Sequence, residues 1–334
     1  MSSPSPTDFP YHGPRAPLAS LTGSPLWSMP IDAVVAAFVA RGWTHRGGER
    51  VETPYGLGPE VHAFDVPQAD GTLRPFLWIP SYGDIVGEET QSETTLRRVF
   101  WILWKAGVKA AVVGGNSGVC EARPDSDPNA IQPGDLVFPW SYRTHQEHRG
   151  LPGTPYAAPW PRHNLFLDAP FCPGLAAQLL PLAQAYEAKG TIRKIHTPET
   201  VRAALVQVET VTFETDFDIL MWRALNKTIS DLEPAKPPVA TLHGDCVNPL
   251  LARFLGIHLL YYHLVCNHAQ GLGTGNIHDT LTTLFLDAYP AMVVDLEGEL
   301  AETLVLPSRP EACRCVSGLI ANPPIFVEAM SGSR

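Results

Sequence analysis

Three short segments collect the residue types that could do chemistry in this chain. They are Gly-Gly-Asn-Ser-Gly at 114–118, His-Gly-Asp-Cys-Val at 243–247, and the stretch 267–277, which begins Asn-His-Ala-Gln-Gly. The amide of Asn267 can both donate to and accept from a heteroaromatic ring. His243 and Asp245 supply an imidazole and a carboxylate, which can pass a proton in general acid–base catalysis. We therefore take Asn267, His243 and Asp245 as candidate catalytic residues.

A structural role is the alternative for each of these segments. Asn267 could cap a turn, and Asp245 could cap the helix that is expected just after it. The three glycines of 114–118 could let a ligand approach the backbone, or they could simply make a tight turn. The glycines of 271–275 do not have the spacing of a dinucleotide fingerprint, so a nicotinamide cofactor is not expected.

A metal site is the other chemistry that the histidines and cysteines could support. The histidines that fall close together in the chain are His243, His258, His263, His268 and His278. However, His258 and His263 are an odd number of residues apart in an expected strand, so they face opposite sides of the sheet. Cys313 and Cys315 are the only close pair of cysteines, and they could bind a metal only with ligands from elsewhere. The sequence therefore predicts reduced thiols and no metal site.

The densest acidic run holds Glu209, Glu214, Asp216 and Asp218. Most of these side chains are expected to solvate a surface or the first turn of the following helix, where negative charge is favourable. Glu209 differs because it lies in a run of strand character. We take it as a candidate for hydrogen bonding to a ligand.

The elements that would position these residues follow from the apolar pattern. Periodic apolar residues predict helices, and short apolar runs predict strands. Helices are expected over 31–41, from the capping box of Thr90 and Glu93 to Gly107, and over 174–188, 215–225, 249–256 and 278–287, with strands over 108–113, 204–212, 239–242 and 257–266. This alternation predicts an α/β sheet. The three segments would then lie outside the carboxyl ends of strands and line one cleft.

Composition limits the class of protein. Hydrophobic residues make up 45% of the 334 residues and charged residues 17%, which excludes a wholly disordered chain. The net charge of −10 argues against nucleic acid as a partner. The N-terminal residues lack the charged and apolar regions of a secretory signal, and no long apolar stretch follows, so a cytoplasmic protein without membrane contact is expected. Residues 1–28 are rich in proline and are interpreted as a partly disordered arm, with one domain over 29–330.

Several motifs together resemble the trimeric nucleoside phosphorylases, and most closely the methylthioadenosine phosphorylase branch. The resemblance covers roughly residues 50–290. It rests on the runs Val51–Gly56, Ala130–Val137 and Asp168–Pro173, the pair Arg143-Thr144, and the stretches Asn248–Gly256 and Leu264–Gly271. The resemblance implies a single-domain, three-layer α/β fold with a central mixed, barrel-like sheet flanked by helices. It also implies a homotrimer that cleaves the C–N glycosidic bond of a nucleoside with inorganic phosphate.

The resemblance assigns roles on the base and ribose side of such a site. Asn267 matches the residue that hydrogen-bonds the purine near N7, Phe213 a ring-packing position, and His243 a position beside the ribose. The candidate substrate-binding residues are Gly115, Asn116, Glu209, Phe213, Gly244, His268, Ala269 and His278.

The phosphate side departs from the family pattern. Ser81-Tyr82-Gly83 stands where the family has an Arg-His pair before a glycine, and Gly115 and Gly244 replace hydroxyl residues. Thr22 matches the threonine of the first glycine loop. Segments 114–118, 243–247 and 267–277 contain no lysine or arginine, and desolvating a phosphate dianion without a cation costs several kcal/mol. These departures argue against phosphate as the second substrate, and no other cofactor is expected.

Two hypotheses follow for the activity. The first is an enzyme that cleaves a purine nucleoside or methylthioadenosine-like compound, with water or weakly held phosphate attacking the sugar. The second is a repurposed family member. It would either catalyse a different reaction on another ring compound, such as hydrolysis, isomerisation or cyclisation, or bind its ligand without turnover.

Overall fold

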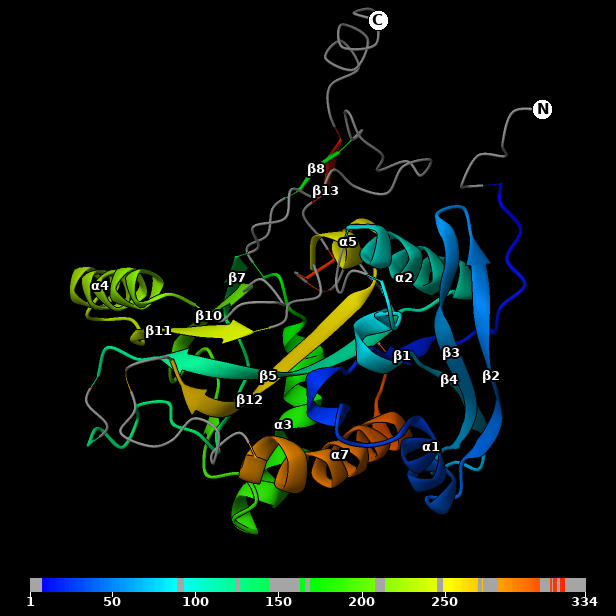
Figure 1. Cartoon of the computed structure of the whole chain (residues 1–334), viewed down its shortest axis with the longest axis horizontal. Helices are drawn as coiled ribbons and strands as arrows, with labels where there is room; N and C mark the ends of the chain where they lie inside the picture. The colour runs from blue at the N-terminus through cyan, green and yellow to red at the C-terminus, as the bar shows by residue number, and fades with distance from the viewer. Residues whose placement is uncertain are drawn as a thin grey trace, which may run out of the picture.

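The fold is taken from a computed structural model (Figure 1). It describes residues 8–321 except 89–92, 124–125, 144–162, 166–168, 208–213, 245–248, 270–271, 273–281, 307–312, 314 and 317–318. No helix among these residues is long and apolar enough to cross a membrane.

The N-terminal part of the chain forms one edge of the main sheet. Its elements are β1 (Leu18–Ser20), η1 (Ser24–Leu26), α1 (Ile31–Ala40), β2 (Thr44–Thr53), β3 (Gly56–Pro67), β4 (Leu73–Trp78), η2 (Pro80–Gly83) and α2 (Glu93–Ala106). β2, β3 and β4 pair antiparallel as a meander, and β1 joins β4 in parallel. Leu18–Ser20 is fully buried between β4 and β5, although the sequence was interpreted as an arm up to residue 28. Three residues are too few to show a strand pattern among prolines.

The rest of the chain builds the centre and the far edge. Its elements are β5 (Ala110–Cys120), β6 (Leu136–Val137), β7 (Ser141–Arg143), β8 (His163–Leu165), α3 (Pro173–Ala188), β9 (Ile195–His196), β10 (Arg202–Gln207), α4 (Asp216–Leu232), β11 (Val239–Gly244), α5 (Pro249–Phe254), β12 (His258–His268), η3 (Thr282–Ala288), α7 (Tyr289–Thr303) and β13 (Leu319–Ala321).

The main sheet is mixed and branches at β5. Its path runs β2-β3-β4-β1-β5-β11-β10-β7, and β12 pairs with both β5 and β6. One edge of β5 is shared, because β1 pairs in parallel with its first residues and β11 pairs antiparallel with its last ones. The other edge pairs in parallel with β12 along almost its whole length. A short stretch of β5 therefore has no strand beside it on the first edge.

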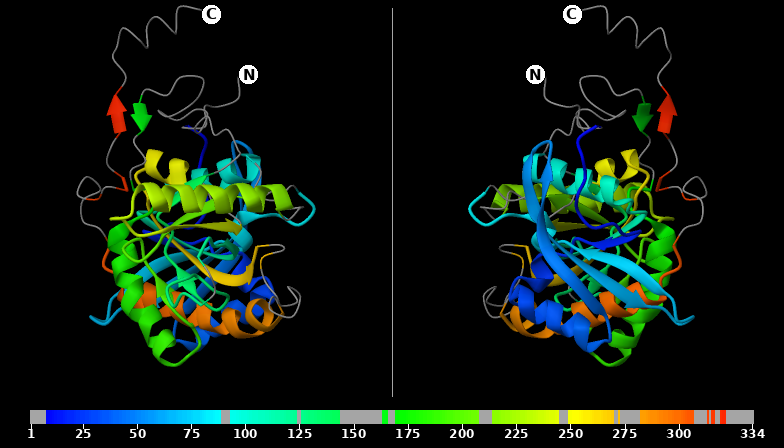
Figure 2. Two further views of the ribbon diagram at one scale, coloured as in Figure 1. Left: turned by 90° about the vertical axis from the view of Figure 1, so that its left-hand side faces the viewer. Right: turned by 90° about the vertical axis from the view of Figure 1, so that its right-hand side faces the viewer.

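Helices cover both faces of this sheet, as the three views show (Figures 1 and 2). One apolar cluster packs α2 and α5 against the sheet, and a second packs α1, α3 and α7 against the other face. Alternate residues of β12 belong to the two clusters, with Leu259 and Tyr261 in one and Leu260 and Tyr262 in the other. This is the three-layer α/β sandwich with a mixed central sheet that the sequence predicted.

The structure extends three of the expected strands at their C-terminal ends. Residues 114–118 are not a loop, because β5 continues through them to Cys120, and His243, Gly244, Asn267 and His268 also lie within strands. Helix α7 was not predicted because it is buried on nearly all sides, which removes the one-sided apolar pattern of a surface helix. The meander β2–β4 was also absent from the sequence prediction.

Candidate functional site

Gly118 of β5 lies between the two principal candidate residues. His243 of β11 is its register partner on one side, and Asn267 of β12 is its partner on the other. Register partners on adjacent strands project their side chains to the same face of a sheet. A row of three positions, His243, Gly118 and Asn267, therefore crosses the sheet at this level.

A β-bulge brings Asn267 into this row. The register of β12 against β5 shifts between Val265 and Asn267, so the regular alternation of faces is broken there. Bulges commonly redirect a side chain beside an active site. A Cβ placed on Gly118 would lie 2.1 Å from His243 Nε2 and 2.9 Å from Asn267 Nδ2. The lack of a side chain at Gly118 is what makes room for the imidazole and the amide.

The carboxylate that orients His243 is Glu214. Its Oε2 lies 2.9 Å from His243 Nδ1, and both side chains are almost fully buried. The imidazole ring of His243 also stacks on the ring of Trp222 in α4, with ring centroids 5.8 Å apart. The sequence analysis expected Glu214 among side chains that solvate a surface or helix end, and this was wrong. Thr215 is the N-cap of α4 in a capping box with Asp218, so Glu214 precedes the helix and faces β11.

Two buried polar groups, one in this row and one beside it, lack partners among the described residues. They are His243 Nε2 and both polar atoms of the Asn116 amide. Asn116 lies two residues before Gly118 in β5 and so shares its face. Buried polar atoms are nearly always hydrogen-bonded in native proteins. These atoms are therefore suited to contact a ligand.

A buried carboxyl group from helix α7 lies beside strands β1 and β12. Glu297 of α7 accepts hydrogen bonds from Ser20 Oγ at 2.7 Å and Tyr262 OH at 2.8 Å, and also from Thr22 Oγ1. Burial raises the pKa of Glu297, and burial together with the nearby Glu297 carboxylate raises that of Tyr262. Sequence analysis missed Glu297, because it stands between Asp295 and Glu299 and nothing in that local pattern marks it as the buried carboxylate. Thr22, expected at a phosphate site, is instead bonded to this carboxyl group.

The stretch of β5 without a neighbouring strand is completed by two hydroxyl groups. The backbone N–H of Gly114 donates to Thr22 Oγ1 at 2.8 Å, and that of Asn116 donates to Ser24 Oγ at 2.9 Å. Backbone N–H groups of this kind can bind an anion. In this protein the hydroxyl groups of Thr22 and Ser24 already accept hydrogen bonds from these two N–H groups.

Tyr82 fills the space beside these groups. Its hydroxyl lies 2.9 Å from Ser24 Oγ, and a Cβ on Gly23 would come within 2.0 Å of its ring. Ser81 and Tyr82 both have positive φ, at 51° and 59°, which is costly for residues other than glycine. Ser81 and Tyr82, at the expected position of an Arg-His pair, thus supply a strained turn and a buried ring, with no cation.

Gly115 and Gly244, two of the predicted substrate-binding residues, lie where their lack of a side chain allows close packing. Gly115 faces the opposite side of the sheet, where a Cβ would meet His263, so it is not brought to the row. Burial lowers the pKa of His263 to about 3, which keeps that imidazole neutral. Gly244 allows close strand packing, since a Cβ would lie 2.5 Å from the Asn116 carbonyl oxygen.

His268, the last residue of β12, and Ala269, which follows it, lie beside the row. The carbonyl oxygen of His268 accepts from Asn267 Nδ2 at 2.7 Å. Ala269 packs in a small apolar cluster with Ile219 and Trp222 of α4. The predicted residues Asp245, Glu209, Phe213 and His278 lie outside the described residues.

Comparison with known proteins agrees with this arrangement of strands. No protein-family model and no curated protein matches the sequence. A methylthioadenosine phosphorylase from an antarctic soil metagenomic library aligns with a TM-score of 0.61 at 17% identity, covering 94% of this chain and 95% of its own. A double mutant of adenosine/methylthioadenosine phosphorylase from Schistosoma mansoni, solved with adenine, aligns with a TM-score of 0.61 at 14% identity, covering 89% and 96%.

A further solved structure has the same fold at lower similarity. It is the methylthioadenosine phosphorylase of Schistosoma mansoni in complex with tubercidin, with a TM-score of 0.56 at 12% identity, covering 86% of this chain and 92% of that one. These alignments span nearly the whole of each protein and confirm the resemblance found in the sequence motifs. The chain has the nucleoside phosphorylase fold.

Proposed function

We propose that this protein cleaves the C–N glycosidic bond of a purine nucleoside or a methylthioadenosine-like compound, with water rather than phosphate as the nucleophile. The observation that carries the proposal is the row His243, Gly118 and Asn267, with Glu214 behind the imidazole. The solved structures with this fold include complexes with adenine and with tubercidin. A flat heteroaromatic ligand is therefore consistent with the fold as well as with the residues.

Each group in the row has a definite role in this reaction. Asn267 donates a hydrogen bond to the departing purine, on which negative charge develops as the bond to the sugar breaks. The Glu214 carboxylate, 2.9 Å from His243 Nδ1, favours the tautomer with its proton on that nitrogen, which leaves Nε2 as the basic nitrogen that takes a proton from water. The water oxygen bonds to the anomeric carbon, and the proton passes on to the departing base. The products are a free base and a free sugar.

Water is favoured as the nucleophile by the contacts at Thr22, Ser24 and Tyr82. The two backbone N–H groups of β5 that could bind an anion already donate to Thr22 and Ser24. Thr22 in turn donates to Glu297, and the Tyr82 ring packs against Gly23. A phosphate dianion would have to displace a buried ring and approach a carboxyl group, and these described contacts include no lysine or arginine in compensation.

The direct test is product analysis with purified protein. Methylthioadenosine, adenosine and inosine are incubated with and without inorganic phosphate, and bases, free sugars and sugar phosphates are separated by chromatography. We expect free base and free sugar at the same rate in both conditions. A rate that rises with phosphate, together with a sugar 1-phosphate product, would contradict the use of water. Binding of these compounds without any product would show a binding protein instead of an enzyme.

Variants separate a catalytic role from a structural one. Asn267→Ala, His243→Ala and Glu214→Gln are each expected to lower the rate by at least about 100-fold, since acid–base and electrostatic groups contribute on this scale. Glu199→Gln, at an exposed position, is the matched control for Glu214→Gln. Melting temperature is measured for every variant. A variant that still binds the nucleoside but melts at a much lower temperature would show that the substituted residue has a structural role.

We infer that the protein assembles as a homotrimer, as the resemblance implies. Support comes from α4, which carries large apolar side chains on its exposed side. Phe217, Leu220 and Leu232 are 73%, 64% and 75% exposed. An exposed apolar patch of this kind commonly marks an interaction surface.

A further inference from the structure

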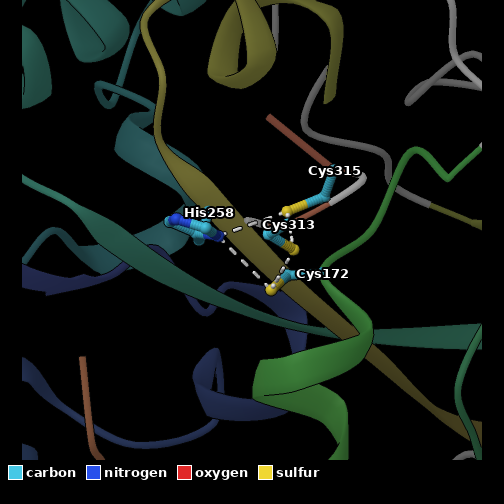
Figure 3. Close-up of side chains that lie close together, drawn as sticks. All are labelled: Cys172, His258, Cys313 and Cys315. Atoms are coloured by element: carbon cyan, nitrogen blue, oxygen red, sulfur yellow. Dashed lines mark hydrogen bonds between the residues drawn. The ribbon is translucent and has the colours of Figure 1, made fainter. Parts of the chain in front are cut away.

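Four side chains with metal-binding atoms meet at the other end of β12. They are Cys172, His258, Cys313 and Cys315, and one ligand atom from each lies within 4.8 Å of all the others (Figure 3). Three of the four are buried to 2% exposure or less, and Cys313 is half-buried. The sequence analysis expected ordinary thiols, because Cys313 and Cys315 alone are too few to bind a metal. The fold supplies two more ligands from distant segments.

The four ligands come from three separate elements of the fold. Cys172 immediately precedes α3, and its backbone N–H donates to the carbonyl of Leu259 in β12 at 2.7 Å. His258 is the first residue of β12, and its backbone N–H donates to the carbonyl of Lys109 at 2.8 Å. Two regular elements therefore fix Cys172 and His258. Cys313 and Cys315 lie beyond α7 and reach the same point.

Three of the distances between these atoms lie within about 0.2 Å of the edges of a tetrahedron around one metal ion. With metal–sulfur bonds of ~2.3 Å and metal–nitrogen bonds of ~2.0 Å, tetrahedral geometry gives edges of about 3.8 Å between sulfurs and about 3.5 Å from sulfur to nitrogen. Cys172 Sγ lies 3.6 Å from Cys313 Sγ and 3.5 Å from His258 Nδ1, and Cys315 Sγ lies 3.3 Å from His258 Nδ1. The Cys313–Cys315 edge is shorter, at 3.0 Å. A rotation of the half-buried Cys313 side chain would lengthen this distance between the two sulfurs.

A disulfide does not account for the cluster. Sulfur atoms in a disulfide are ~2.05 Å apart, and at most two of the three cysteines could form one. The third thiol and the imidazole would then remain buried together. A thiol is a weak hydrogen-bond donor, so the contacts of Cys172 and Cys315 with the one nitrogen His258 Nδ1 gain little from hydrogen bonding. Coordination of one cation uses all four groups at once.

We propose that Cys172, His258, Cys313 and Cys315 bind one Zn²⁺ ion in a closed, tetrahedral Cys3His site. Three thiolates and one neutral imidazole are a ligand set typical of structural zinc, and they leave no open position for catalysis. His258 coordinates through Nδ1, the nitrogen that faces the sulfurs.

Neighbouring groups favour the charge that this site would carry. Zinc with three thiolates has one net negative charge. Cys172 lies at the N-terminus of α3, where the helix dipole stabilises a thiolate. Arg253 of α5 is fully buried, and it donates to the backbone carbonyls of Cys315 and Ala169, next to two of the ligand-bearing segments. Its guanidinium offsets the negative charge and orients both segments.

The site would have a structural role, separate from the candidate active site. His258 and Asn267 are nine residues apart on one strand, which corresponds to about 30 Å. Zinc would tie Cys313 and Cys315, far along the chain, to the start of α3 and to the first residue of β12. The proposed hydrolysis does not depend on it.

The test is metal analysis of the full-length protein, purified under reducing conditions without chelators. We expect about one zinc per chain, because four ligands complete the tetrahedral shell of a single ion. We expect Cys313→Ser and His258→Gln to lose the zinc, while Cys120→Ser retains it. Cys120 is a matched control, since it is a buried free cysteine in β5 outside the cluster. Zinc retained by both cluster variants would contradict the proposal.

A second measurement on the unmodified protein covers the case in which cluster variants fail to fold. Cobalt is exchanged for zinc, and the visible spectrum is recorded. Tetrahedral coordination by three thiolates is expected to give intense d–d bands together with thiolate charge-transfer bands. Removal of zinc by a strong chelator is expected to lower the melting temperature by about 5 °C or more. Protein that contains no zinc and binds no cobalt, or a Cys313–Cys315 disulfide found by mass spectrometry, would overturn the proposal.

Discussion

His243 and Asn267 approach each other across Gly118, from strands that run in opposite directions on either side of it. β11 is antiparallel to β5 and β12 is parallel to it, so residues 24 positions apart in the chain meet over one glycine. The sequence analysis expected these residues in loops beyond the ends of strands, whereas the structure places them within the strands. The residues lie on the face of the sheet, because the strands continue past the positions at which loops were expected.

Gly118→Ala tests this relationship directly. The new methyl group would lie 2.1 Å from His243 Nε2, so the imidazole or the strand must move. We expect loss of nucleoside cleavage and a decrease in unfolding free energy of about 1–3 kcal/mol, typical of overpacking. Gly174→Ala is the control, because its added Cβ meets nothing closer than 3.9 Å. Full activity of Gly118→Ala would mean that His243 and Asn267 do not act together.

Tyr82 variants test whether its ring fills the space of an anion site. Tyr82→Phe removes the contact with Ser24 and is expected to cost about 1 kcal/mol of unfolding free energy. Tyr82→Ala is expected to cost about 3–5 kcal/mol, because it leaves a cavity in the core. Urea denaturation measures both values, and each protein is repeated with added phosphate. Stabilisation of the unmodified protein by phosphate would show that the ring does not block an anion.

Glu297 gives the stability a defined pH dependence. Burial raises its pKa above the ordinary value of 4.5, so the folded protein binds this proton more tightly than the unfolded chain does. The contribution to stability is complete below pH 4.5 and is lost as the pH rises through the folded pKa. Each unit of difference in pKa corresponds to about 1.4 kcal/mol.

The measurement compares the unmodified protein with Glu297→Gln, which cannot ionise. We expect the unfolding free energy of the unmodified protein, relative to the variant, to fall as the pH rises above 4.5 and through the raised pKa of Glu297. Denaturant titrations at several pH values provide the two curves. A difference that is constant or that grows with pH would show that the Glu297 pKa is not raised.

Sedimentation tests the proposed assembly. We expect one species at three times the chain mass of 36.4 kDa. Phe217→Ser combined with Leu220→Ser removes two exposed apolar side chains from α4 and is expected to shift the species towards monomer. Val305→Ser is the control, as an exposed apolar residue outside α4. A monomer in the unmodified protein at micromolar concentration would contradict the trimer.

Local patterns in the sequence determined several features correctly. The periodicity of Val34 and Phe38 with Gly42 after them predicts α1, and the apolar run before Asn267 predicts β12. These signals depend only on neighbours within a few residues, so no tertiary information is needed to detect them. The motifs that resemble nucleoside phosphorylases likewise predicted the fold.

The tertiary structure alone decided which polar residues meet. Glu214 lies 29 residues before His243, and Cys172 lies 141 residues before Cys313, so their encounters depend on strand register and on where helices cross the sheet. A one-residue shift in register moves every side chain of a strand to the opposite face. The bulge at Asn267 and the branching of the sheet at β5 are features of that register. For this reason the sequence by itself predicted elements such as α1 and β12 and made Asn267 a candidate, whereas the contacts of Glu214, of Glu297 and of the four clustered cysteine and histidine side chains emerged only from the packed fold.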